Sequence, residues 1–293
     1  MGAYSSITRM RKGKEGKEAE DMGRVKTYEE LKFTDDFMFC KILESREDLC
    51  KELVELILGV KIEIVHSIGK QRPIEITPDN KGIRMDVYME GDDKIFNVEM
   101  QNAHVEDLPR RARYYQSACD IEMLEKGAKY NDLKDSYIIF ICTFDPFNQG
   151  LSKYTVVPHI VENPEAEYND GTTKVFLSSA VEDDEEISEG LRDFLNYIGG
   201  RETTSDLAGK LEAALADAKS KKKWSKEYMF LYEIEDAARA EGREEGLAEG
   251  RARMLYELVS DKKISLEEAS KIANLSADEF IAEMKKEGFA TGE

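Results

Sequence analysis

The sequence predicts an α/β domain with a mixed central sheet flanked by helices, followed by an all-α C-terminal extension. Two helical segments over about residues 35–58 precede the first strands. A further helical segment over about 109–126 separates a hairpin at 82–101 from an apolar run at 137–144. That run is typical of a strand buried on both faces. The order helix, strands, helix and strand is typical of an α/β domain.

The length and composition fit one ordinary domain with an extension. The chain has 293 residues, of which 41% are hydrophobic and 35% are charged. No apolar run approaches the roughly 20 residues that cross a bilayer, and residues 9–26 contain no apolar signal core. We therefore expect a cytoplasmic protein with no membrane contact.

The net charge of −19 argues against a protein that coats DNA, because non-specific affinity for DNA comes from Lys and Arg on phosphates. The charge is uneven along the chain. Residues 161–200 contain eleven acids and two bases, whereas Arg110, Arg111 and Arg113 form a local basic patch. The acidic segment is expected to face water, away from any phosphate.

The first helices have recognisable limits. Thr34 or Asp35 can cap a helix through Leu43, and a second helix ends at Gly59. A strand is expected at 60–68. Before these elements, residues 1–26 are rich in Gly, Lys and Glu without periodicity, which predicts disorder.

The segment 82–101 predicts a β-hairpin with an acidic turn at 91–93. The period of two separates an apolar face from a polar face. The apolar face consists of Met85, Val87, Met89, Phe96, Val98 and Met100. The polar face consists of Arg84, Asp86, Tyr88, Asn97, Glu99 and Gln101.

The polar face of this hairpin contains two acids close together. A loop centred on Gly91 and Asp92 places Asp86 opposite Asn97 and diagonal to Glu99, with Cβ atoms roughly 7–8 Å apart. Two such carboxylates repel, and a hard cation such as Mg²⁺ or Mn²⁺ between them removes the conflict. The alternative is a solvated polar face on which Arg84 neutralises one acid.

The helix over about 109–126 follows this candidate site and ends at Gly127. A stripe of Tyr114, Ala118, Ile121 and Leu124 is expected to pack on the sheet. Arg110 and Arg113 share another face, and Arg111 is expected to point elsewhere. The shared face either contacts the DNA backbone or pairs with acids such as Glu106 and Asp107.

The cysteines and histidines do not predict a zinc site. Cys40, Cys50, Cys119 and Cys142 are scattered and contain no CxxC pair, so we interpret them as reduced thiols in or near the core. None of the three histidines has ligand spacing with a cysteine. His104 either lies at the edge of the candidate site or is an ordinary loop residue.

The last third of the chain is rich in Ala, Glu, Lys and Arg. Gly242, Gly246 and Gly250 fall on one side of a helix, which predicts either close approach of a partner helix in a homo-oligomer or a frayed linker helix. Two capping signals follow, at Ser265 and at Ser276. The resulting helix-turn-helix pattern has an acidic second helix, which favours an interaction or oligomerisation module over a DNA reader.

Residues 27 to about 200 resemble the PD-(D/E)XK nuclease family of transposases, also called Rpn-type recombination-promoting nucleases. The resemblance rests on ordered segments with the residues Asp86, Glu99 and Gln101 among them. These segments are 33–39, 86–101, 107–117, 124–130, 136–147 and 169–172. The resemblance implies a restriction-endonuclease-like core.

The resemblance also implies a site. Asp86 and Glu99 correspond to the acids that hold Mg²⁺ or Mn²⁺, and Gln101 occupies the last catalytic position, which is Lys in most enzymes of the wider superfamily. A neutral amide can orient water but supplies no charge. Arg84 can supply the missing cation or pair with Asp86. Such enzymes often add an acid from the first helix, for which Asp36 is the candidate, with Glu44 behind it.

The predicted function is therefore metal-dependent DNA endonuclease activity linked to recombination or transposition. A catalytically silent DNA-binding or assembly protein is the alternative, and an antiphage or toxin-like nuclease would share the same chemistry. We expect a tail at 1–26, a nuclease-like domain at 27–200, a helical linker at 201–258 and a small helical module at 259–293.

Overall fold

The computed structural model describes residues 26–70, 73–74, 83–124, 127–182 and 184–290. The predicted disordered tail therefore lies outside the described residues, apart from Lys26. The chain divides into two compact units, residues 1–225 and 226–293, which are described separately.

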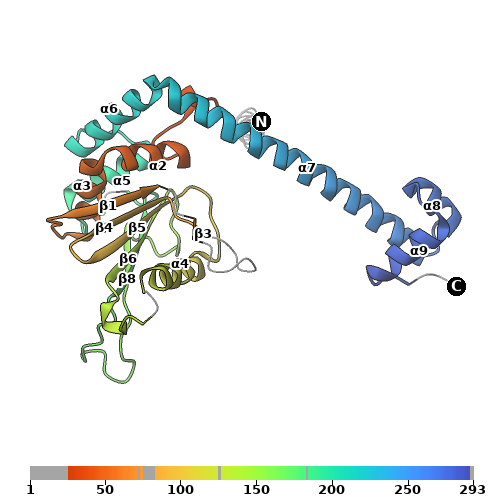
Figure 1. Ribbon diagram of the computed structural model, residues 1–293, viewed down its shortest axis with the longest axis horizontal. Helices are drawn as coiled ribbons and strands as arrows, with labels where there is room; N and C mark the ends of the chain where they lie inside the picture. Colours follow the sequence, from red (N-terminus) through yellow and green to blue (C-terminus); the bar gives the residue numbers. More distant parts are fainter. Residues whose placement is uncertain (1–25, 71–72, 75–82, 125–126, 183, 291–293) are drawn as a thin grey trace, which may run out of the picture. The chain divides into compact units, whose positions relative to one another are not determined.

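The first unit is built on a six-stranded mixed sheet with the order β1-β4-β5-β6-β8-β7 (Figure 1). Its strands are β1 (Val65–Lys70), β4 (Val87–Gly91), β5 (Lys94–Gln101), β6 (Asp135–Cys142), β7 (Lys153–Val156) and β8 (Thr172–Ser178). The central strands β5, β6 and β8 are parallel, and the remaining pairs are antiparallel. The prediction of a mixed sheet is confirmed.

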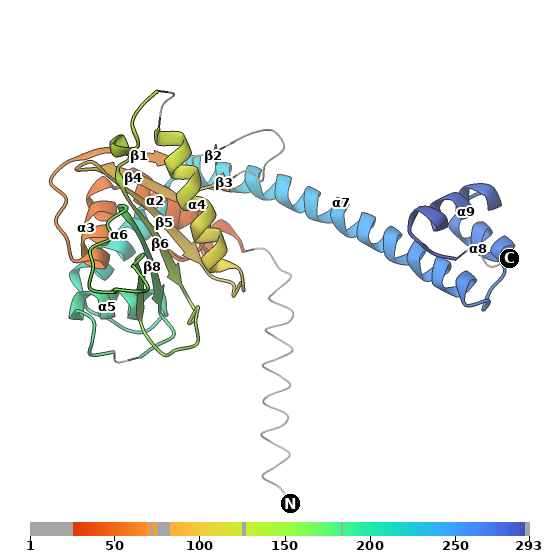
Figure 2. The same ribbon diagram turned by 90° about the horizontal axis from the view of Figure 1, so that it is seen from below.

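Helices cover both faces of this sheet (Figures 1 and 2). One face has four helices, α2 (Asp36–Ser45), α3 (Glu47–Leu58), α5 (Glu189–Ile198) and α6 (Asp206–Ser220). Cys50 of α3 contacts Met89 of β4 on this side, with the sulfur atoms 3.9 Å apart. The other face has α4 (Leu108–Met123), whose buried residues pack on Ile95, Ile138 and Phe140.

Several shorter elements complete the unit. They are the 3₁₀ helices η1 (Tyr28–Glu30) and η2 (Tyr130–Asp132), and the two-stranded sheet of β2 (Pro73–Ile74) and β3 (Ile83–Arg84). The strand expected from residue 82 to 88 is therefore interrupted between Arg84 and Val87. As a result Met85 packs on the α4 side of the sheet, rather than on the side expected from strict alternation.

The turn between β4 and β5 differs from the expected one. Asp92 and Asp93 both have positive φ, 49° and 58°, so the two-residue turn is centred on them rather than on Gly91 and Asp92. The Asp92 carboxylate also accepts hydrogen bonds from the backbone N–H groups of Glu63 and Ile64, at 2.5 and 2.8 Å. The resulting register pairs Tyr88, and not Asp86, with Asn97.

The polar face of the hairpin is buried, which contradicts the alternative of a solvated face. Asn97 and Glu99 are 0% and 1% exposed. The reason is the parallel pairing of β5 with β6, because the connection between them contains α4 and covers this face. The predicted stripe of α4 is correct in part: Ala118 is buried and Tyr114 packs against the core, but Ile121 is 57% exposed. The buried residues of α4 are Leu108, Ala112, Tyr115, Gln116, Ala118 and Cys119.

The second unit is a small helical module. The end of α7 (Lys222–Ser260) packs with α8 (Leu266–Ala273) and α9 (Ala277–Lys286) around a core of Leu255, Tyr256, Val259, Ala269, Phe280 and Met284. Both predicted capping boxes are present, at Ser265 and Ser276. Gly242, Gly246 and Gly250 lie in α7 and are exposed, so a homo-oligomer through these helices stays a prediction.

Candidate functional site

The two acids of the predicted site lie together at one end of the paired strands. Asp86 directly precedes β4, and Glu99 lies near the carboxyl end of β5. The backbone N–H of Asp86 donates to Oε1 of Glu99 at 3.0 Å, and the N–H of Met100 donates to Oδ2 of Asp86 at 3.0 Å. The antiparallel backbone therefore holds each carboxylate against the other strand.

Both carboxyl groups lie in an environment that disfavours their charged forms. Asp86 is 9% exposed and Glu99 is 1% exposed. Burial raises the pKa of Asp86, and the nearby charges of Glu99 and Asp36 raise it further. Burial also raises the pKa of Glu99, although the Asp86 N–H and Arg111 oppose this. A bound cation would relieve the cost of holding these acids ionised.

Helix α2 contributes two further donor groups beside Asp86. Asp36, the first residue of α2, and Cys40 one turn later place their ligand atoms and that of Asp86 within 4.8 Å of one another. Of the two acids considered on the first helix, Asp36 lies beside Asp86, and Glu44 is not part of this group. The carboxylate oxygens of Asp36 and Asp86 suit a hard divalent cation such as Mg²⁺ or Mn²⁺, whereas the thiol of Cys40 does not.

Arg111 is a site residue that the sequence interpretation missed. Its Nη2 donates to Oε2 of Glu99 at 3.3 Å, and its Nη1 donates to Oε1 of Gln101 at 3.0 Å. It was expected to point away from the face shared by Arg110 and Arg113, and it does, but the sequence did not place it beside Glu99 and Gln101. A signal in the sequence that could have identified Arg111 is its spacing of four residues from Tyr115, which places both side chains on one face of the helix.

Gln101 is the last residue of β5 and is 8% exposed. Its Nε2 donates to the carbonyl oxygen of Ala103 at 2.6 Å, while its Oε1 accepts from Arg111. The amide therefore has a fixed orientation, with one N–H of Nε2 available for another acceptor.

The other predicted residues lie outside this cluster. Arg110 and Arg113 are exposed on α4, and within the described residues neither forms an ion pair with Glu106 or Asp107. The ring of His104 lies against Phe144, with centroids 5.0 Å apart. The backbone of Arg84 is in β3, and its side chain lies outside the described residues.

All four cysteines are buried and none of them is in a disulfide, as expected. Cys40 is nevertheless part of the donor group, which the scattered spacing of the cysteines did not predict. No helix in the described ranges is long and apolar enough to cross a membrane.

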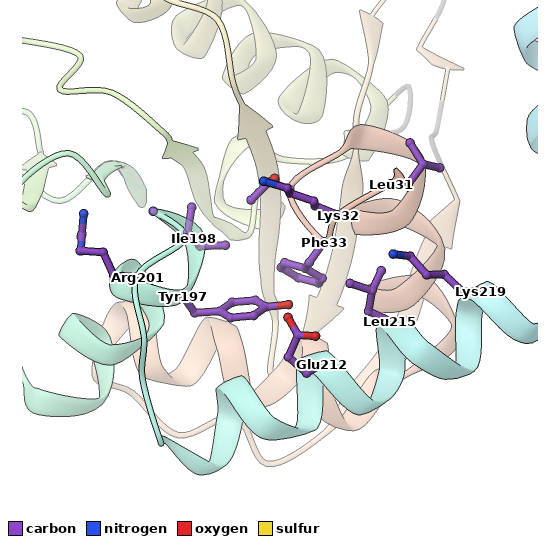
Figure 3. Close-up of a pocket in the computed structure, with 12 residues that line it drawn as sticks. Leu31, Lys32, Phe33, Tyr197, Ile198, Arg201, Glu212, Leu215 and Lys219 are labelled. Carbon is purple, nitrogen blue, oxygen red and sulfur yellow. The ribbon is translucent and has the colours of Figure 1, made fainter. Parts of the chain in front are cut away.

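A separate pocket of about 470 Å³ lies between α5, α6 and the segment before α2 (Figure 3). Three of its polar side chains, those of Tyr197, Arg201 and Glu212, interact with other groups of the protein. The hydroxyl of Tyr197 faces Glu212, and burial together with this carboxylate raises the pKa of Tyr197. Arg201 donates to the side chain of Asn196 and to the carbonyl oxygen of Ser179, at 2.7 and 2.8 Å. The pocket contains none of the predicted site residues.

The fold and the site together define a class of protein. A mixed sheet between helical layers, with Asp86 and Glu99 at the end of paired strands, is a restriction-endonuclease-like α/β core. Residues 33–205 match the family described as PD-(D/E)XK nuclease family transposase, and the chain belongs to this family. No curated protein and no solved structure gives a significant match.

Membership confirms the resemblance that the sequence motifs predicted. It indicates a nuclease-related or transposition-related function, and nucleases of this kind generally use divalent metals.

Proposed function

We propose that this protein is a metal-dependent DNA endonuclease linked to recombination or transposition. The observation that supports the proposal best is the hydrogen-bonded pair of buried acids, Asp86 and Glu99, with Asp36 beside Asp86. Buried acids without enough cationic partners destabilise a fold, so their presence here is more readily explained by a site than by packing.

Asp86 and Glu99 would hold Mg²⁺ or Mn²⁺ in this proposal, with Asp36 as a third ligand. The bound ion would polarise the scissile phosphate and lower the pKa of the attacking water. Gln101 orients that water through the N–H of its amide that Ala103 does not use.

The DNA backbone would approach along α4. Arg110 and Arg113 are exposed three residues apart on this helix, which suits contacts with two phosphates. Arg84 precedes Asp86 by two residues and remains a candidate for the same role. The four buried free thiols fit a reducing cytoplasm, which we propose as the compartment.

One observation favours the alternative of a silent DNA-binding or assembly protein. Gln101 is neutral, and both ends of its amide are already hydrogen-bonded. These properties are expected of a protein that kept the nuclease fold but lost the ability to hydrolyse DNA.

The proposal is tested by a cleavage assay on supercoiled and linear DNA in the presence of Mg²⁺, Mn²⁺, Ca²⁺ or EDTA. Removal of a metal ligand removes the ion on which the reaction depends, so Asp86→Ala and Glu99→Ala are expected to be inactive. Asp93→Asn is the matched control, because it removes one charge from the exposed turn of the same hairpin.

Cleavage that requires Mg²⁺ or Mn²⁺ and is lost in both site variants, but not in the control, supports the endonuclease. DNA binding without cleavage under every metal condition supports the silent alternative. Metal-dependent cleavage that survives Asp86→Ala contradicts the assigned site.

A further inference from the structure

The guanidinium of Arg111 joins two residues of the candidate site. Nη2 donates to Glu99 and Nη1 donates to Gln101, at 3.3 and 3.0 Å. Among the described residues, Arg111 is the one cation that forms a hydrogen bond or ion pair with either of these side chains. A positive charge therefore lies beside the neutral amide of Gln101.

The surroundings of Arg111 hold this charge in place. Nε and Nη2 both donate to the hydroxyl of Tyr115, at 3.0 and 2.8 Å. The guanidinium carbon lies 5.0 Å from the ring centroid of Tyr115 and 5.6 Å from that of Phe140. Cation–π contacts of this kind strengthen when the cation is partly removed from water. The side chain is 35% exposed, so Arg111 is fixed from the protein side and still reaches solvent.

The donors of Arg111 are almost fully used. A guanidinium has five N–H groups, and here the hydrogen bonds to Tyr115, Glu99 and Gln101 occupy four of them. The remaining one is on Nη1, the nitrogen that binds Gln101. An exposed arginine that only solubilised the helix would not be constrained in this way.

Hydrolysis of a phosphodiester increases the negative charge on the phosphate in the transition state, and a fixed cation nearby stabilises that charge. Gln101 cannot supply such a charge. We propose that Arg111 is a positioning residue that orients Glu99 and Gln101. It also supplies, from helix α4, the positive charge that the neutral Gln101 at the end of β5 does not provide. This inference rests on the proposed endonuclease function.

The charge balance of the site gives a readout that does not depend on cleavage. Asp36 and Asp86 belong to the group of possible metal ligands, Glu99 accepts a hydrogen bond from the backbone of Asp86, and Arg111 offsets the charge of Glu99. Removal of its charge makes the site more negative by one unit. A bound divalent cation should then be held more tightly, although cleavage becomes slower.

The experiment compares Arg111→Met, Arg111→Lys and the double variant Arg111→Met with Gln101→Lys in the full chain. Arg192→Met is the matched control, since Arg192 is a half-buried arginine of α5 that donates to the carbonyl oxygen of Asp184. Each variant is measured for kcat and KM on DNA, for Mn²⁺ affinity by calorimetry, and for thermal unfolding.

Arg111→Met is expected to lower kcat by about 10²-fold or more and to change KM by less than about threefold. Its Mn²⁺ affinity should rise by about three- to tenfold. Arg111→Lys should retain more activity than Arg111→Met. The double variant should recover at least about tenfold in kcat and return Mn²⁺ affinity toward the original value, because the lysine introduced by Gln101→Lys restores the charge.

An unchanged kcat in Arg111→Met overturns the inference while the proposed function stands. The inference is also overturned if Arg111→Met binds Mn²⁺ more weakly and the double variant does not regain kcat. These two results together are expected of an arginine that only supports the structure. If the unmodified protein cleaves no DNA, the proposed function fails, and the Mn²⁺ affinities alone decide whether Arg111 offsets the charge of the site.

Discussion

The two faces of strand β5 contain opposite kinds of side chain and are equally buried. Phe96, Val98 and Met100 face helices α2 and α3, whereas Asn97, Glu99 and Gln101 lie beneath α4. The apolar face gains free energy from its burial, but the polar face must offset the desolvation of an acid. One face therefore stabilises the fold, whereas the other contains the residues of the candidate site.

The largest change expected in the free energy of unfolding comes from the apolar face. Phe96 is 0% exposed and its ring stacks on Tyr137 with centroids 5.2 Å apart. Phe96→Ala should lower the free energy of unfolding by about 3–4 kcal/mol, because it leaves a cavity. Urea denaturation followed by circular dichroism measures this change. A loss below about 1 kcal/mol would show that this face is not the stabilising one.

A smaller change of opposite sign is expected on the polar face. The pKa values of Asp86 and Glu99 are raised in the folded state, so the stability they contribute is present at low pH and is lost as pH rises through those values. Asp86→Asn should therefore raise the metal-free unfolding free energy by about 1 kcal/mol at about pH 8, and by less at about pH 6.

Thermal unfolding in EDTA at both pH values checks this sign, with Asp93→Asn as the control for loss of an exposed charge on the same hairpin. A variant that is less stable than the unmodified protein at the higher pH would contradict the view that the polar face costs stability. The same variant should be inactive in the cleavage assay.

The smallest effects are expected outside both faces, on the exposed side of α4. Arg110→Gln and Arg113→Gln should each weaken DNA binding by about two- to fivefold and reduce the salt dependence of binding by about one unit of slope. Fluorescence anisotropy at several salt concentrations measures both quantities, and neither variant should change thermal unfolding. Unchanged affinity in the combined variant would remove these arginines from the DNA-binding surface.

Local signals in the sequence predicted much of the fold. Gly59 ends α3 with φ of 68°, and Ser265 and Ser276 form their capping boxes, because these features depend on neighbouring residues alone. The acids Asp86 and Glu99 were identified from the hairpin pattern and the family motif. The structure places them together as expected, although in a different register.

The missed features depend on contacts that are distant in the sequence. A period of two separates the faces of a strand, but it does not show that α4 covers the polar face. The predicted stripe of α4 was correct at Tyr114 and Ala118, which pack in or against the core, and wrong at Ile121, which is exposed. Arg111 was missed because two of its partners, Glu99 and Gln101, are on strand β5 and are distant from α4 in the sequence.

The turn at Asp92 and Asp93 determines which residues lie opposite each other at the far end of the strands, where the candidate site is. Moving the turn by one position would shift the pairing by two residues and would leave each side chain on its own face. The core would then remain intact, while Asp86 would lie opposite Asn97 instead of beside Glu99. Changes in this turn could thus alter the candidate site without altering the core. The hydrogen bonds that Asp92 accepts from Glu63 and Ile64 hold the turn, and with it the register of the two strands.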